Sequence, residues 1–343
     1  MTQPILSVRN LRVRFKSDKG EAWVVDDVSL DVSAGKTLAL VGESGCGKSM
    51  TALSILRLIP SPPGKIASGE ILLGGRDLLA LPETDMQAIR GAEISMIFQE
   101  PMTSLHPVFR AGNQIAAAIM LHSELSFAEA RRETVQLLAQ VGIPSPEERA
   151  DDYPHQMSGG MRQRAMIAMA LSCKPSVLIA DEPTTALDVT IQAQILDLLK
   201  KLQEQLGMAI ILITHDLGIV AENADEVAIM YAGKIVERAP VQDLYSSPRH
   251  PYTVGLFNSL PKLNAQRARL VPIPGQVPAA TEFPAGCRFH PRCAHAMSCC
   301  TKEVPKTLDA GAGHSVACWL YDTSTMSVQG RPVGIPAAEA AKR

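Results

Sequence analysis

The chain has 343 residues, a formal net charge of −2 and hydrophobic residues at 46% of its positions. This size allows one large core with an appended segment. The near-neutral charge gives no electrostatic reason to expect nucleic acid as a partner. The apolar runs have strand length rather than the roughly 20 residues of a membrane-spanning helix. Because the N-terminus lacks the basic and apolar regions of a signal peptide, we expect the chain to stay in the cytosol.

The first third of the chain has the pattern of strands followed by a glycine-rich turn. Period-2 alternation in the first 32 residues predicts antiparallel strands with one buried face. A short apolar strand at 37–41 leads into the turn and a helix that begins near Lys48. Residues 69–98 then have the pattern of strand, loop, short helix and strand.

The middle of the chain alternates helices with buried strands. Residues 112–171 have the three- and four-residue apolar spacing of helices. A strand at 176–181, a helix at 191–205 and a strand at 209–214 follow. Apolar strands that alternate with helices predict an α/β fold with a mainly parallel sheet.

Residues 42–49 have the sequence GESGCGKS, which matches the phosphate-loop pattern G-x-x-x-x-G-K-[ST]. The loop follows a predicted strand and opens a predicted helix, as the motif requires. Its glycines allow backbone N–H groups to approach phosphate oxygens, and the helix N-terminus adds positive potential. We expect Lys48 to neutralise the β- and γ-phosphates of a nucleotide and Ser49 to bind Mg²⁺. A glycine-rich loop that binds nothing is the alternative.

The strand at 176–181 ends in two acidic residues, Asp181 and Glu182. Adjacent carboxylates at the end of a buried strand are costly to desolvate unless a cation lies beside them. We expect Asp181 to hold Mg²⁺, directly or through water, and Glu182 to orient or deprotonate the attacking water. A solvated strand end is the alternative.

Further motifs resemble those of the ABC ATPase family. Ser158-Gly159-Gly160 opens a helix ahead of the acidic strand end and resembles the family's signature, with Met161 where a glutamine is usual. Gln99 matches the Q-loop, His215 the switch histidine, and Asp188 the D-loop.

The resemblance implies a P-loop fold with a RecA-like parallel sheet core, an antiparallel β subdomain and a helical subdomain at about 100–171, all within a nucleotide-binding domain of residues 1–240. It implies ATP and Mg²⁺ as ligands and ATP hydrolysis as the activity. Two such domains would pack head to tail around ATP. The implied residues are Glu182, His215 and Gln99 for catalysis; Gly42, Ser44, Gly45, Cys46, Gly47, Lys48, Ser49, Met50 and Phe15 for ATP; Ser49, Gln99 and Asp181 for Mg²⁺; Ser158, Gly159 and Gly160 for the ATP of the opposite subunit; and Asp188 for the D-loop that crosses the dimer interface.

Phe15 has two interpretations of equal weight. The resemblance implies an aromatic residue that stacks on adenine near this position, whereas an ordinary core phenylalanine is the alternative. Trp23 is a second candidate for the stacking residue.

Several segments resemble the dipeptide and oligopeptide permease ATPases in particular. They are EPMTSLHP at 100–107, YPHQMSGGMRQR at 153–164, DEPTTALDVTIQAQIL at 181–196 and HPYT at 250–253. The resemblance implies peptide import at the cytoplasmic face of the cell membrane, with motion transmitted through residues 100–107. It implies a second, homologous ATPase subunit, two transmembrane permease subunits and an extracytoplasmic peptide-binding protein as partners, without nucleic acid. Nickel, opines or glutathione are alternative cargoes, and a nucleic-acid-linked ABC ATPase is an alternative class.

Residues 241–320 are rich in Pro, Gly and Cys and predict an irregular C-terminal extension, and we expect residues 321–343 to form a disordered tail. Cys287, Cys293, Cys300 and Cys318 are spaced C-x5-C-x6-C-x17-C, which in a reducing cytosol indicates metal rather than disulfides. The spacing lacks the C-x2-C pairs of structural zinc sites. The resemblance implies a [4Fe-4S] cluster, which four thiolates suit. A zinc site with His295 and His314, or no metal, are the alternatives, and Cys299 is a spare.

Overall fold

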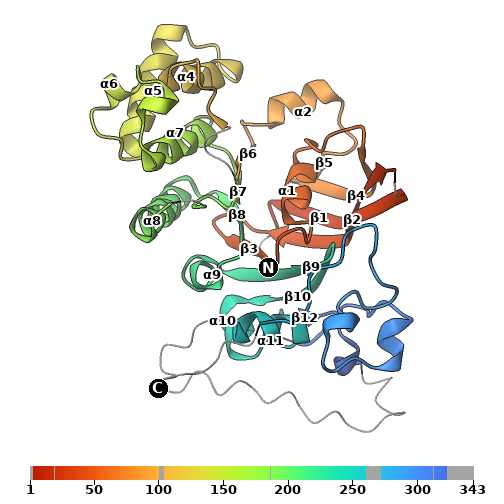
Figure 1. Ribbon diagram of the computed structural model, residues 1–343. Coiled ribbons are helices and arrows are strands. Elements are labelled where there is room, and N and C mark those ends of the chain that lie inside the picture. Colours follow the sequence, from red (N-terminus) through yellow and green to blue (C-terminus); the bar gives the residue numbers. More distant parts are fainter. Residues whose placement is uncertain are drawn as a thin grey trace. The chain divides into compact units, whose positions relative to one another are not determined.

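The computed structural model describes residues 3–18, 20–99, 104–185, 187–259, 272–311 and 313–322. They fall into two compact units, each described by itself below. The first unit comprises Met1–Ser7, Asp31–Thr37 and Ile71–Ile213, and the second comprises Val8–Leu30, Leu38–Glu70 and Thr214–Arg343. Figure 1 labels the elements of both units along the chain. Of the disordered tail predicted at 321–343, residues 323–343 lie outside the described residues, whereas Tyr321 ends the short helix η4 (Trp319–Tyr321).

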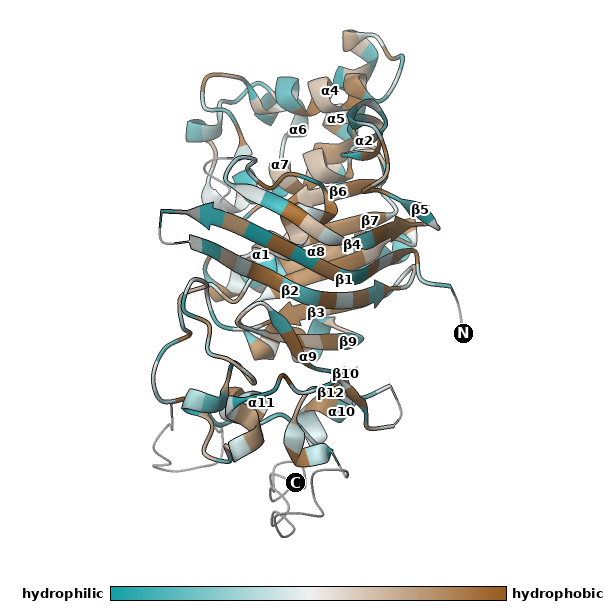
Figure 2. Ribbon diagram, turned by 90° about the vertical axis from the view of Figure 1, so that its right-hand side faces the viewer, coloured by the Kyte–Doolittle hydropathy of each residue, from teal (hydrophilic) through white to brown (hydrophobic). Residues whose placement is uncertain are grey.

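The first unit is built on three parallel strands, β6 (Ile94–Ile97), β7 (Val177–Asp181) and β8 (Ala209–Thr214). All five residues of β7 and all six of β8 are buried, and β7 is largely brown in Figure 2. Strands that are apolar on both sides are typical of a parallel sheet covered by helices. The predicted α/β fold with a parallel core is confirmed.

Helices make up most of the remaining first unit, and the predicted helical stretch at 112–171 is confirmed. Helices α4, α5 and α7 pack against one another, and α7 also packs against β6. The helix α5 begins with a capping box, in which Ser126 and Glu129 exchange hydrogen bonds with each other's backbone N–H. The elements are β5 (Arg76–Asp77), α2 (Glu83–Ile89), α4 (Ala111–Leu121), α5 (Phe127–Gln140), α6 (Pro146–Arg149), η1 (Pro154–Gln156), α7 (Gly159–Leu171) and α8 (Val189–Leu206).

The second unit contains a strand hairpin and a strand that leads into the phosphate loop. Strands β1 (Leu6–Ser17) and β2 (Gly20–Val32) form the hairpin, in which Arg14 pairs with Glu21 and Arg12 with Asp26 at growing distance from the turn. Strand β4 (Gly64–Leu73) lies next to β1. Strand β3 (Thr37–Val41) pairs in parallel with β9 (Glu226–Tyr231). The helix α1 (Lys48–Ile55) follows β3 directly after the glycine-rich turn, as predicted.

The C-terminal extension is more regular than its composition predicts. Strand β10 (Lys234–Pro240) pairs antiparallel with β9, and β12 (Ser315–Val316) adds to its other edge. The aromatic side chains of Tyr231, Tyr252 and Phe289 are buried in one core cluster. The remaining elements of the second unit are α9 (Leu217–Asn223), α10 (Val241–Ser246), α11 (Pro251–Asn258), η2 (His290–Arg292), η3 (Ser298–Thr301), β11 (Leu308–Asp309) and η4 (Trp319–Tyr321).

Candidate functional site

The phosphate loop lies between β3 and α1, where the sequence predicted it. The ammonium group of Lys48 is buried within the loop, with the residue only 6% exposed. It donates hydrogen bonds to the carbonyl oxygens of Gly42 at 2.8 Å and Glu43 at 3.1 Å. The positive charge of Lys48 therefore lies at the start of the helix. Phosphate oxygens of a nucleotide can replace the carbonyl oxygens of Gly42 and Glu43 as its hydrogen-bond acceptors.

Two glycines of the loop leave no space for a larger residue. A Cβ atom on Gly42 would lie 2.2 Å from the carbonyl oxygen of Met230. Gly47 has a φ of 110°, and a Cβ atom there would lie 2.5 Å from the carbonyl oxygen of Val24. Backbone atoms cannot yield as a flexible side chain can, so both positions require glycine.

The acidic strand end brings together two predicted catalytic residues of the first unit. The amide nitrogen of Gln99 donates to a carboxylate oxygen of Glu182 at 3.2 Å, across a sequence separation of 83 residues. The hydroxyl of Thr185 donates to the same oxygen at 2.8 Å. Gln99 and Glu182 lie close together because β6 and β7 pair in parallel, so that the carboxyl ends of both strands lie at the same edge of the sheet. Asp181, the last residue of β7, is 3% exposed.

Glu182 has a backbone conformation that is rare for its residue type. Its φ is 47°, in the left-handed region. Its N–H donates to the carbonyl oxygen of Ile213 at 2.9 Å, which holds the residue in place. Non-glycine residues in this region cost of the order of 1 kcal/mol and occur often at functional sites. The residue in this conformation is the one that accepts the hydrogen bond from Gln99.

The signature segment forms the start of α7. The hydroxyl of Ser158 accepts a hydrogen bond from the N–H of Met161 at 3.2 Å and so caps the helix. A Cβ atom on Gly160 would lie 3.1 Å from a methyl group of Ile191. The carboxylate of Asp188 caps the next helix, α8, by accepting from the N–H of Ile191 at 2.9 Å. Ser158 and Asp188 thus have structural partners within the first unit.

The second unit contains the remaining predicted nucleotide residues. His215 directly follows β8 and is exposed. The ring of Phe15 packs on the backbone of β4, since a Cβ atom on Gly64 would lie 2.8 Å from its Cζ atom. The guanidinium of Arg12 lies over the ring of Trp23, 4.4 Å from its centroid. The role of either aromatic residue toward adenine stays a prediction.

The four predicted cysteine ligands, Cys287, Cys293, Cys300 and Cys318, line one pocket. Burial raises the pKa of all four thiols, to about 11 for Cys287 and about 12 for Cys318. Free thiolates are therefore unfavourable in this pocket, whereas a bound cation would stabilise them. The donor set thus fits a thiolate-ligated centre. Among the described residues, however, no group of three or more His, Cys, Asp or Glu side chains has a geometry ready to hold a metal ion.

The other candidates near this pocket differ in their surroundings. Cys299 is not among the lining residues, whereas His295 is. The ring of His314 is 3% exposed and is hydrogen-bonded to Glu237 at 2.7 Å, and it does not line the pocket. Of the two histidines predicted as zinc ligands, only His295 therefore faces the cysteines.

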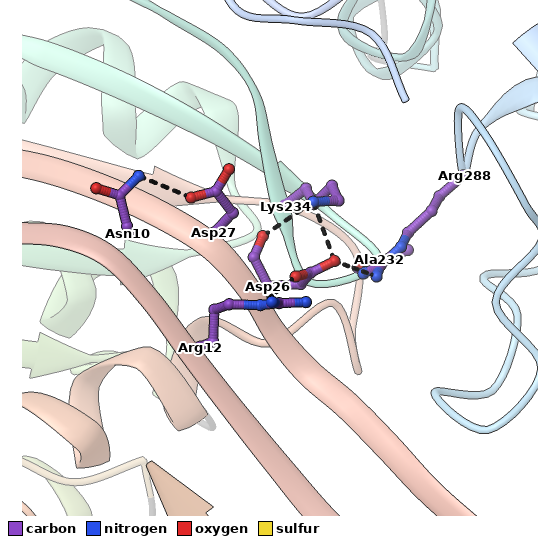
Figure 3. A network of polar contacts seen from close by, with 7 residues as sticks. All are labelled: Asn10, Arg12, Asp26, Asp27, Ala232, Lys234 and Arg288. Atoms are coloured by element: carbon purple, nitrogen blue, oxygen red, sulfur yellow. Dashed lines mark hydrogen bonds and ion pairs between the residues drawn. The ribbon is translucent and has the colours of Figure 1, made fainter. Parts of the chain in front are cut away.

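A buried ion cluster, which the sequence did not indicate, joins the extension to the hairpin. Arg288, the residue after Cys287, pairs with Asp26 of β2 at 2.6 Å. Lys234 and Arg12 pair with the same carboxylate at 3.0 and 2.9 Å (Figure 3). Arg288 also donates to the carbonyl oxygen of Ala232. An isolated arginine beside a cysteine gives no local signal of a partner 262 positions away.

The phosphate loop, the acidic strand end with its glutamine and the Ser-Gly-Gly helix start define an ATPase of the ATP-binding-cassette class. The solved dimer of the ATP-binding cassette MJ0796, in a post-hydrolysis state bound to ADP and Pi, has a similar fold. Its TM-score is 0.62 at 26% identity, over 69% of this chain and 98% of that chain.

The sequence comparisons narrow this class to one family. A family model described as ABC transporter matches residues 25–185, and one described as Oligopeptide/dipeptide transporter, C-terminal region, matches residues 236–300. The dipeptide transport ATP-binding protein DppD of Bacillus subtilis is 50% identical over 93% of this chain and 96% of that protein. The oligopeptide transport ATP-binding protein AppD of Bacillus subtilis is 51% identical over 93% of this chain and 97% of that protein. The chain belongs to the ABC transporter ATP-binding proteins of the oligopeptide/dipeptide transporter family.

None of the helices in the described part of the chain is long and apolar enough to cross a membrane.

Proposed function

We propose that this chain is the ATP-hydrolysing subunit of an importer that takes up di- and oligopeptides across the cytoplasmic membrane. The observation that carries the proposal is the sequence identity of 50–51% to peptide-transport ATP-binding proteins over 93% of this chain, including the C-terminal region. The phosphate loop and the Gln99–Glu182 pair supply the chemistry that such a subunit needs.

In this mechanism the protein acts by positioning and by neutralising charge. Lys48 binds the β- and γ-phosphates, and backbone N–H groups of residues 42–50 surround them. Ser49, Asp181 and Gln99 would hold Mg²⁺, which would supply positive charge to the phosphates when bound. Glu182 takes a proton from the attacking water, and His215 contacts the γ-phosphate. Ser158, Gly159 and Gly160 meet the ATP of the opposite subunit, and Asp188 lies in the D-loop that crosses the dimer interface.

The proposed assembly places the chain at the cytoplasmic face of the membrane without crossing it. Its partners are two transmembrane permease subunits, a second, homologous ATPase and an extracytoplasmic peptide-binding protein. The segment that would transmit motion to the permeases includes residues 100–103, which lie outside the described residues. Its exposed neighbours Val108 and Phe109 offer apolar surface beside that segment.

The assembly is tested by purifying the chain under mild detergent from cells that express its operon. Two polytopic membrane proteins and a second ATPase should co-purify. Reconstituted in vesicles, the complex should accumulate dipeptide in an ATP-dependent manner, and Lys48→Ala should abolish both accumulation and hydrolysis. Purification with ribosomes or DNA, or ATP-driven uptake of nickel but not of peptide, would contradict the proposal.

We also propose that the cysteine pocket holds a [4Fe-4S] cluster. Four cysteines that line one pocket support a thiolate-ligated centre, although the thiols are not preassembled as a cage. Anaerobically purified protein should contain iron and acid-labile sulfide in equal amounts. Cys293→Ser should lose both, whereas Cys299→Ser, which changes a cysteine outside the pocket lining, should keep them. Zinc without sulfide would contradict the cluster.

A further inference from the structure

The phosphate loop contains one acidic side chain, Glu43, at a position that the motif leaves open. A carboxylate in this loop repels the phosphates that the loop binds, unless a cation neutralises it. Arg292, the residue before Cys293, supplies that cation. Its Nη1 atom lies 3.2 and 3.1 Å from the two carboxylate oxygens of Glu43.

The guanidinium of Arg292 is held in place by the extension. Its side chain is only 7% exposed, against 29% for Glu43. The Nε atom donates to the carbonyl oxygen of Pro274 at 2.8 Å, and Nη2 donates to that of Gly275 at 3.3 Å. Nη1 also donates to the hydroxyl of Tyr231 at 3.4 Å. A buried arginine whose donors are satisfied in this way has little freedom to leave Glu43.

A second residue of the extension holds the backbone of the same glutamate. The N–H of Glu43 donates to the hydroxyl of Tyr252 at 3.0 Å. Tyr252 is fully buried, and its ring lies 4.7 Å from that of Tyr231 and 5.4 Å from that of Phe289. Phe289 belongs to the same cysteine-rich segment as Arg292. The extension therefore fixes Glu43 by both its side chain and its backbone.

We propose that Arg292 is a positioning residue for nucleotide binding, which neutralises and orients Glu43 so that the phosphate loop accepts the triphosphate. The cysteine-rich segment thereby forms part of the wall of the nucleotide site. This inference rests on the proposed binding of ATP by the loop. A purely structural ion pair is the competing explanation, and it predicts lower stability without a specific effect on nucleotide affinity.

The two explanations are separated by a double-mutant cycle on the full-length chain, with the dissociation constant of Mg-ATP and the melting temperature as readouts. Arg292→Gln should weaken ATP binding roughly tenfold, because it leaves Glu43 as an uncompensated negative charge beside the phosphates. Glu43→Gln should bind ATP at least as tightly as the wild type. In the double variant, Arg292→Gln should cause little further loss, since the charge that it neutralises is gone.

Arg288→Gln is the matched control, since Arg288 lies in the same segment but pairs with Asp26 rather than Glu43. Its effect on ATP affinity should be the same with and without Glu43→Gln. Arg292→Lys, which keeps the charge, should retain most of the affinity and serves if Arg292→Gln does not fold.

Equal ATP affinity of the wild type and Arg292→Gln would overturn the inference. It would also be overturned if Arg292→Gln caused the same loss of affinity whether or not Glu43→Gln is present. Failure of the wild type to bind ATP would instead refute the proposed function.

Discussion

The substitution Glu182→Gln tests the proposed catalytic base with little change in packing. The carboxylate oxygen that accepts from Gln99 and Thr185 can be replaced by the amide oxygen of glutamine, which accepts both hydrogen bonds. The left-handed φ of 47° costs glutamine as much as glutamate. We therefore expect the free energy of unfolding to change by no more than about 0.5 kcal/mol.

The expected loss lies in catalysis. An amide cannot take the proton of the attacking water, and a positioned general base contributes about 10²- to 10⁴-fold to the rate. The barrier to hydrolysis should thus rise by about 3–5 kcal/mol. Affinity for Mg-ATP should hold or increase, because a negative charge near the γ-phosphate is removed. The variant should accumulate in an ATP-bound state.

Three measurements check this expectation on the assembled transporter: phosphate release, bound nucleotide after rapid gel filtration, and melting temperature. Thr185→Val is the control, because it removes one hydrogen bond to Glu182 and keeps the carboxylate. It should cost less than tenfold in turnover, in line with the loss of one hydrogen bond of about 1 kcal/mol. Undiminished hydrolysis by Glu182→Gln would show that another group is the base.

Further predictions concern the phosphate loop, the helix start at Ser158 and the buried ion cluster around Asp26. Gly42→Ala places a Cβ atom 2.2 Å from the carbonyl oxygen of Met230, so calorimetry should find ATP binding lost; unchanged affinity would refute the close packing. Ser158→Ala should cost about 1 kcal/mol in urea unfolding through the lost helix cap. Asp26→Asn should cost about 3 kcal/mol, because it leaves the buried Arg288 and Lys234 without their anion.

The same cluster predicts a pH dependence. Burial alone would raise the pKa of Asp26, but Lys234, Arg288 and Arg12 hold it below its usual 3.8. The folded state therefore binds this proton less readily than the unfolded state, so the contribution to stability is present above pH 3.8 and is lost as the pH falls below it. Asp26→Asn should remove that part of the pH dependence of unfolding. An identical profile for both proteins would contradict it.

Much of the local structure of the candidate nucleotide site could be predicted from the sequence. The loop ending at Lys48 and Ser49, the acidic end of β7 and the helix start at Ser158 are contiguous motifs whose chemistry depends on adjacent residues. Strand β8 has the predicted bounds, because an apolar run between polar turns leaves few choices for a buried strand. The composition of the extension gave weaker signals, so α10, α11 and the pairing of β12 with β10 were not predicted.

Only the tertiary structure decided which distant residues meet. It brought Gln99 to Glu182, gathered the four cysteines around one pocket and paired Arg292 with Glu43. Each of these contacts joins segments far apart in sequence, where periodicity and spacing carry no information about the partner. Burial strengthens the Arg292–Glu43 pair in particular, because the Arg292 side chain is only 7% exposed and a charge removed from water requires a partner at close range.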